Sequence, residues 1–158
     1  MRHGTAEDQA DSGIDADRPL SAAGRQRVHA VAEHLVHQGE DPLSVFTSPL
    51  VRAVQTAEIV ALVTGLGDRG GTVDVRRDIA PDGNIVRLVH RLVVEGGKRV
   101  MIVGHEPDLS GLVSTLLGSF GGSFDKAMVV GVHLPSTGAP KLRFVLDPKT
   151  LRMDPPSP

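Results

Sequence analysis

The sequence contains no cysteine, which excludes disulfide bonds and metal sites built on thiolates. It has no apolar run of the roughly 18 residues needed to cross a bilayer, and its start shows no signal-peptide pattern. The formal net charge of -2 gives no support for binding to nucleic acid or to an anionic membrane. From these absences we expect a cytoplasmic protein that binds neither a membrane nor nucleic acid.

The length and composition fit one globular domain. The 158 residues are enough to enclose a single core, and 40% hydrophobic with 23% charged residues is typical of a folded protein. No internal repeat is visible. We therefore predict one domain over residues 1–150, followed by a flexible tail over residues 151–158.

Apolar residues spaced three and four apart predict four helices. They lie over residues 22–38 and 49–64, and they begin near residues 85 and 107 in the other two cases. Ser21, Ser48 and Asn84 are the expected N-caps, and Gly65 is expected to end the second helix. Residues 5–20 are polar and irregular, which predicts a loop.

Five short β-compatible stretches lie at residues 43–47, 72–75, 100–103, 127–134 and 141–146. The last two are expected to form a hairpin around residues 136–140. Strands that alternate with helices predict an α/β fold of three layers (α/β/α) with a mostly parallel central sheet. Ligands of such sheets bind beyond the carboxyl ends of the strands.

Basic side chains follow three of the predicted strand ends. Residues 1–4 read MRHG, residues 47–52 read TSPLVR and residues 103–107 read VGHEP. Together they supply two arginines and two histidines: Arg2, His3, Arg52 and His105. Two guanidinium groups can fork onto phosphoryl oxygens, and a neutral imidazole can attack phosphorus. The helix starts after Ser48 and Glu106 would add dipoles that favour an anion.

Arg52 gives an independent indication of a bound anion. It lies in the first turn of its predicted helix, where the helix dipole disfavours a cation. A bound phosphate would compensate for that misfit. Taken by its position alone, a solvated surface arginine is the alternative interpretation.

The remaining histidines are expected to be structural, and no cofactor is implied. They are His29, His34, His37, His90 and His133. A metal site at His3 and His105 is an alternative, but Arg2 and Arg52 would repel a cation there. We therefore predict a site without a metal ion.

Three longer motifs resemble a known family. Residues 17–24 read DRPLSAAG, residues 48–57 read SPLVRAVQTA and residues 103–107 read VGHEP. With Arg2-His3-Gly4 they are similar, in order, to the motifs of the histidine phosphatase superfamily, which also contains the cofactor-dependent phosphoglycerate mutases. The resemblance covers residues 1 to about 146. The DRPL form and the short length resemble its SixA-like branch of phosphohistidine phosphatases.

The resemblance implies a phosphoglycerate mutase-like fold and a covalent mechanism. His3 would accept the phosphoryl group, and Arg2, Arg52 and His105 would hold it until water hydrolyses the intermediate. The candidate substrate-binding residues are Arg18, Gly4, Ser48 and Glu106. For Arg18, pairing with Asp15 or Asp17 is an equally good interpretation.

The sequence offers only one weak candidate for the general acid that the family resemblance leads us to expect. Relatives supply a glutamate in the region that here covers residues 77–84, where Asp82 is the candidate general acid. A turn-forming role before Gly83 is the better interpretation of Asp82. An imidazole leaves without strong acid assistance, since its conjugate acid has a pKa of about 6.5, whereas an alkoxide does not. The site therefore favours phosphohistidine over a sugar phosphate.

The strand that precedes Arg-His-Gly in the family is truncated here, because Met1 directly precedes Arg2. A missing central strand would leave buried backbone groups unpaired at about 1–3 kcal/mol each. We expect either residues upstream of Met1 or another segment to fill this position in the sheet.

The main functional prediction is a phosphatase that acts on phosphohistidine of a protein partner, such as a histidine phosphotransfer domain. A phosphomonoesterase acting on a small phosphorylated metabolite is the alternative within the superfamily. A further alternative is an inactive phosphate-binding or interaction protein. The chain is too short for the capping insertions of a mutase.

Overall fold

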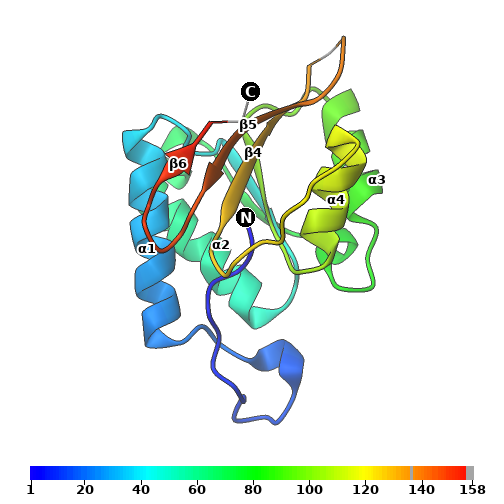
Figure 1. Ribbon diagram of the computed structural model, residues 1–158. Helices are drawn as coiled ribbons and strands as arrows, with labels where there is room; N and C mark the ends of the chain where they lie inside the picture. The colour runs from blue at the N-terminus through cyan, green and yellow to red at the C-terminus, as the bar shows by residue number, and fades with distance from the viewer. Residues whose placement is uncertain (136, 156–158) are drawn as a thin grey trace.

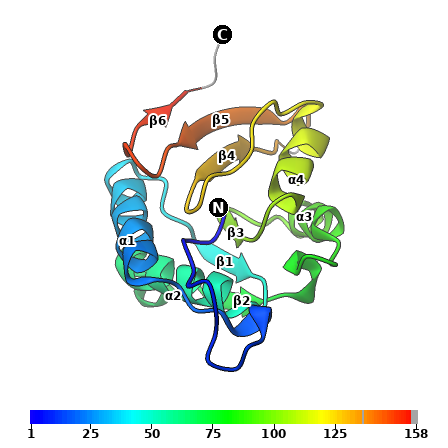
Figure 2. The ribbon, with the colours of Figure 1, turned by 60° about the horizontal axis from the view of Figure 1, so that its bottom comes forward.

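Two three-stranded sheets form the middle layer of the protein (Figures 1 and 2). The computed structural model describes residues 1–135 and 137–155. In the first sheet β1 (Ser44–Thr47) lies between β2 (Val73–Val75) and β3 (Val100–Val103), and all three strands are parallel. The second sheet is antiparallel, in the order β4 (Val129–His133), β5 (Lys141–Leu146), β6 (Met153–Asp154). The predicted hairpin of β4 and β5 is confirmed.

Residues 1–3 join the two sheets. The backbone N–H of His3 donates to the carbonyl of Gly104, just beyond β3, at 3.1 Å. On the other side the N–H of Arg2 donates to the carbonyl of Met128, just before β4, at 3.0 Å. Figure 2 shows the chain start between β3 and β4. This segment therefore occupies the carboxyl end of the position that the truncated strand would take, and the expectation of residues upstream of Met1 stays a prediction.

Helices cover both faces of the sheets, which confirms the three-layer fold. On one face lie α1 (Ala22–His37) and α2 (Val51–Thr64), and on the other α3 (Ile85–Val94) and α4 (Asp108–Leu117) (Figure 1). Alternation along β1 separates two cores, since Val45 packs in the cluster of α1 and α2 while Phe46 packs in that of α3 and α4. None of the helices in the described ranges has the length and apolar character to cross a membrane.

Local chemistry sets most helix ends as predicted. The Ser21 hydroxyl accepts a hydrogen bond from the N–H of Gly24 at 3.0 Å, and the Asn84 side chain accepts one from Arg87 at 2.9 Å. Gly65 ends α2 in the left-handed region, with φ of 61°. The prediction for Ser48 is wrong, because α2 begins only at Val51 with Leu50 as its N-cap.

The loop and the tail are partly ordered by pairing. Within the predicted loop, Ala6 bridges to Leu20, and a short 3-10 turn, η1, covers Asp15–Asp17. Two further 3-10 turns are η2 (Gly67–Arg69) and η3 (Arg77–Ile79). In the predicted flexible tail, β6 pairs with β5, so this part is a short strand. Residue 136 of the hairpin turn and residues 156–158 of the tail lie outside the described residues.

Candidate active site

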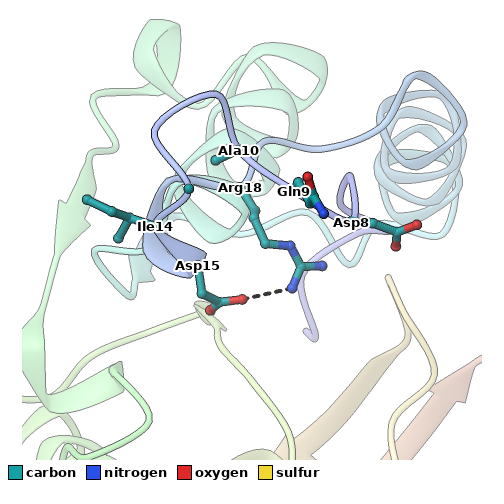
Figure 3. Close-up of a pocket in the computed structure, with 7 residues that line it drawn as sticks. Asp8, Gln9, Ala10, Ile14, Asp15 and Arg18 are labelled. Atoms are coloured by element: carbon teal, nitrogen blue, oxygen red, sulfur yellow. Dashed lines mark hydrogen bonds and ion pairs between the residues drawn. The ribbon is translucent and has the colours of Figure 1, made fainter.

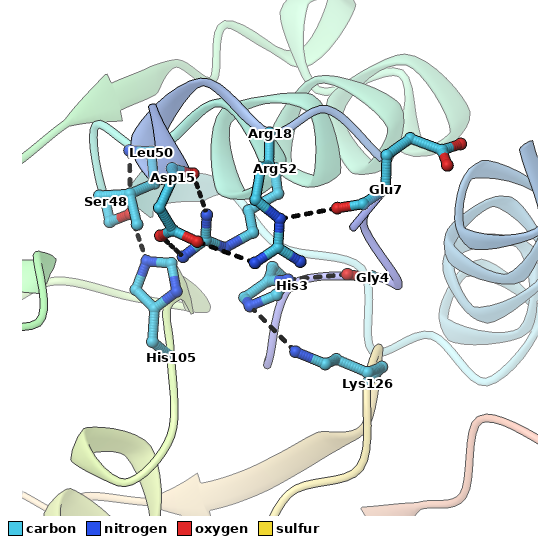
Figure 4. A network of polar contacts seen from close by, with 10 residues as sticks. All are labelled: His3, Gly4, Glu7, Asp15, Arg18, Ser48, Leu50, Arg52, His105 and Lys126. Carbon is cyan, nitrogen blue, oxygen red and sulfur yellow. Dashed lines mark hydrogen bonds and ion pairs between the residues drawn. The ribbon is translucent and has the colours of Figure 1, made fainter. Parts of the chain in front are cut away.

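The structure brings the three predicted basic segments together at the carboxyl edge of the parallel sheet (Figure 4). His3 follows the segment that joins the sheets, His105 follows β3, and Arg52 lies in the first turn of α2. All three are buried, with exposed fractions of 4%, 4% and 8%. The two imidazole rings lie 5.0 Å apart, centroid to centroid.

A hydrogen bond to the backbone fixes the tautomer of His3. Its Nδ1 lies 2.7 Å from the carbonyl oxygen of Gly4. Because a carbonyl only accepts, Nδ1 carries the proton and Nε2 keeps a free lone pair. Burial, with the nearby Lys126 as a second cause, lowers the pKa of His3 from 6.5 to about 3. His3 is therefore a neutral imidazole at physiological pH, with the lone pair of Nε2 available.

His105 is held by the serine that sequence analysis assigned to a helix cap. The Ser48 hydroxyl lies 2.6 Å from Nε2 of His105, and it accepts a hydrogen bond from the N–H of Leu50 at 3.3 Å. Burial, followed by the charge of Arg52, lowers the pKa of His105 to about 4. Ser48 thus positions the second histidine, which explains why it does not cap α2.

Arg52 is paired with Asp15 of the loop. The Nη1 of Arg52 donates to the Asp15 carbonyl at 2.8 Å, and its Nη2 contacts the Asp15 carboxylate at 3.1 Å. Arg18 binds the other carboxylate oxygen of Asp15 at 2.8 Å. These arginines, Arg18 foremost, lower the pKa of Asp15. In the structure a carboxylate of the same chain thus compensates Arg52, a bound phosphate there stays a prediction, and the pairing of Arg18 with Asp15 is confirmed.

Arg2 presents an unpaired nitrogen at the site. Its Nη1 donates to the carbonyl of Phe124 at 2.6 Å, which anchors the guanidinium. Its Nε is buried and has no hydrogen-bond partner among the residues that the structure describes. A buried donor without a partner is costly unless a ligand accepts from it.

The motif around Arg52 also holds the segment of His3 and Gly4 in place. Thr56 accepts from the N–H of Gly4 at 3.1 Å and donates to the Arg52 carbonyl at 2.7 Å. Gln55 accepts from the N–H of Leu20 at 2.8 Å, which ties the loop to α2. Gly4, predicted to bind substrate, therefore acts through its backbone, with its carbonyl on His3 and its N–H on Thr56.

Lys126 is a site residue that sequence analysis missed. Its ammonium nitrogen lies 3.5 Å from Nε2 of His3 (Figure 4). Burial and the nearby Arg2 and Arg52 lower the pKa of Lys126 from 10.5 to about 8. No local sequence pattern marks it, since its place follows from the backbone hydrogen bonds that residues 127 and 128, just before β4, make with residues 2 and 3.

Two other predicted residues stand apart from the four basic ones. The Glu106 carboxylate accepts hydrogen bonds from the N–H and hydroxyl of Ser110, at 3.2 and 2.7 Å, so it is bound to the first turn of α4. Asp82 is exposed in a turn, and none of the described hydrogen bonds or ion pairs links it to His3 or His105. Within the described ranges no group of three or more metal-ligating side chains is placed to hold a metal ion.

A hollow of about 380 Å³ lies in the loop beside the basic residues (Figure 3). Its lining includes Asp8, Gln9 and Ile14. Asp15 and Arg18 also line it, so the hollow and the basic site share these two side chains.

The fold and the site define an α/β protein in which two arginines and two histidines gather at the carboxyl edge of the parallel sheet. The sequence profile of the histidine phosphatase superfamily (branch 1) matches residues 1–73. Phosphohistidine phosphatase SixA of Escherichia coli (strain K12) is 28% identical over 157 residues, which are 97% of this chain and 94% of that protein. The chain belongs to the histidine phosphatase superfamily.

Two further relatives extend the comparison. The structure of the protein histidine phosphatase SixA complexed with tungstate has a TM-score of 0.85, at 28% identity, covering 96% of this chain and 97% of that one. An uncharacterized protein of Picosynechococcus sp. is 38% identical over 112 residues, which are 69% of this chain and 66% of that relative. The recognition of a SixA-like member of the superfamily is therefore confirmed.

Proposed function

We propose that the protein hydrolyses phosphohistidine on a protein partner through a covalent phosphohistidine on His3. The observation that carries the proposal is the state of His3. Its Nε2 is unprotonated and buried, the ammonium group of Lys126 lies 3.5 Å away, and the charge of Arg52 also acts on the ring. A neutral nucleophile among cations attracts a phosphoryl dianion and leaves the charge of the transition state balanced.

The reaction has two displacements at phosphorus. Nε2 of His3 forms a bond to phosphorus while the bond to the substrate imidazole breaks, and that imidazole takes up a proton from solvent. Water then attacks phosphorus and the bond to Nε2 breaks; one proton of the water passes to solvent and the other leaves on the phosphate. Arg2, Arg52 and His105 bind the phosphoryl oxygens throughout, so the mechanism needs no metal ion.

The ionisation of the carboxyl group near the site indicates which kind of leaving group the reaction can release. Asp15 is the carboxyl group in contact with Arg52, and its lowered pKa keeps it ionised and unable to donate a proton at neutral pH. An alkoxide needs such a proton, whereas an imidazole leaves with a conjugate acid of pKa about 6.5. This favours a phosphoramidate, and the similarity to SixA, a phosphohistidine phosphatase, supports the same substrate class.

A trapping experiment tests the proposal. The protein is mixed with a radiolabelled phosphohistidine peptide, quenched in base and mapped by mass spectrometry. We expect the label on His3, and its loss in His3→Ala without loss of the fold by circular dichroism. His29→Ala, a change of the same kind on the exposed surface of α1, should keep the label.

Two results would contradict the proposal. One is a phosphoenzyme that persists in His3→Ala. The other is efficient cleavage of alkyl phosphates without any cleavage of phosphohistidine, which would favour the small-molecule phosphomonoesterase instead. Binding of phosphate without any turnover would favour the inactive phosphate-binding protein.

A further inference from the structure

Lys126 is a cation beside His3, and neither displacement of the proposed reaction uses it. It lies in the segment between α4 and β4, and its side chain is half-buried. The carboxylate next to it in sequence, Asp125, pairs with Lys149 at 2.9 Å instead. The described contact of the Lys126 ammonium is with Nε2 of His3, at 3.5 Å.

The surroundings of Lys126 are predominantly cationic or neutral. The groups that act on its charge are the guanidinium groups of Arg2, Arg52 and Arg18 and, more weakly and with opposite sign, the carboxylate of Asp15. The two imidazoles, of His3 and His105, are neutral at physiological pH. The ammonium group and the three guanidinium groups that act on it repel one another, and an anion seated among them reduces this cost.

We propose that Lys126 is a catalytic residue that binds a nonbridging oxygen of the phosphoryl group as that group moves onto Nε2 of His3. This inference rests on the proposed function, because it needs phosphorus to bond to that nitrogen. The three nonbridging oxygens of a phosphoryl group on Nε2 point outward around the N–P axis. An ammonium 3.5 Å from the same nitrogen is within hydrogen-bond reach of one of them.

The position of Lys126 distinguishes oxygen binding from acid catalysis. In an in-line displacement the leaving atom lies on the far side of phosphorus from Nε2. Lys126 contacts Nε2 itself, so its ammonium lies beside the nucleophile and not beside the leaving atom. Its charge therefore acts on the equatorial oxygens, where the negative charge of a loose transition state is spread.

The test compares three variants with the wild-type protein on a phosphohistidine peptide. Lys126→Met keeps the length of the side chain and removes its charge, and Lys126→Arg keeps the charge. Lys141→Met makes the same change as the first variant at an exposed position of β5. We expect kcat/KM to fall about 100-fold in Lys126→Met, the cost of removing one oxyanion contact, and to stay within about tenfold in Lys126→Arg and unchanged in Lys141→Met.

Two further measurements separate a catalytic from a structural role. Inhibition by vanadate should weaken in Lys126→Met and not in Lys141→Met. The wild-type kcat/KM should fall as the pH rises through about 8, where the ammonium loses its proton, and this alkaline limb should disappear in Lys126→Arg, because a guanidinium keeps its charge.

Each outcome of these measurements supports or overturns the catalytic role of Lys126. Wild-type kinetics in Lys126→Met overturn it, and so do equal losses in Lys126→Met and Lys126→Arg with unchanged vanadate affinity. Circular dichroism and thermal unfolding show whether each variant is folded. The proposed function is judged separately, from the wild-type protein and His3→Ala, so an active, His3-dependent enzyme indifferent to Lys126 would refute only this inference.

Discussion

At the scale of single residues, the carboxylate of Asp15 is paired with Arg52, which the proposed reaction needs to bind the phosphoryl group. It contacts Arg52 at 3.1 Å and Arg18 at 2.8 Å, and its side chain is 65% exposed. An incoming oxyanion must compete with this carboxylate for the same donors. Since the side chain lies in a loop and faces solvent, it can turn away without breaking the core.

Replacing Asp15 should therefore strengthen anion binding. In Asp15→Asn we expect the inhibition constant for vanadate to fall by up to about fivefold, the range of an exposed ion pair. Asp17→Asn is the matched control, because Asp17 lies in the same 3-10 turn and accepts from Ser12. Weaker binding in Asp15→Asn alone would show that Asp15 orients Arg52 and does not compete with the ligand.

The four basic residues could be predicted because each follows a strand end, and parallel strands bring their carboxyl ends to one edge. Lys126 could not be predicted, since the segment before β4 has no periodic pattern and its place depends on backbone hydrogen bonds of residues 127 and 128 with residues 2 and 3. The pairing of Arg52 with Asp15 also depends on where the loop folds back. Contacts between segments distant in sequence are thus the part of the site that local patterns leave open.

At the scale of elements, the contact between α1 and the segment after His3 depends on a glycine. A Cβ built on Gly24 would lie 2.0 Å from the carbonyl oxygen of Thr5, which is backbone and cannot turn aside. Gly24→Ala should therefore push α1 away from the segment that follows His3. We expect a loss of about 1–3 kcal/mol in the free energy of unfolding, measured by urea denaturation, with lower activity.

Gly111 is the matched control for Gly24→Ala. It lies inside α4, and a Cβ there would meet no atom within 4 Å. Gly111→Ala should raise the free energy of unfolding by about 0.5–1 kcal/mol, because alanine favours the helix. Equal effects of the two substitutions would contradict the close-packing explanation.

The sequence predicts the start of a helix where the capping side chain bonds a nearby backbone N–H. It does not do so where that side chain bonds a residue distant in the sequence. Ser21 and Asn84 each accept from a backbone N–H three residues further on, so sequence alone locates them. Ser48 resembles them in sequence, but its hydroxyl binds His105, 57 residues away. Because the Ser48 hydroxyl is hydrogen-bonded to His105, it does not cap α2, which begins three residues after Ser48, at Val51.

At the scale of the whole molecule, the fold buries two neutral histidines at the carboxyl edge of its parallel sheet. His3 and His105 are buried, and burial lowers their pKa values to about 3 and about 4. The unfolded chain binds protons on these histidines near pH 6.5, so acid favours the unfolded state. Asp15, whose folded pKa is lowered, adds its own loss only below the unfolded carboxyl value of 3.8.

The free energy of unfolding should therefore fall as the pH is lowered from 6 to 4, before the carboxylates contribute. The unfolded state binds more protons than the folded state in this window, so stability rises with pH at up to about 1.4 kcal/mol per pH unit for each histidine. Urea unfolding at a series of pH values measures this slope. The double variant His3→Gln/His105→Gln should lose most of it, because glutamine does not titrate. A slope that survives in the double variant would show that other groups cause the acid sensitivity, and that the two buried imidazoles do not.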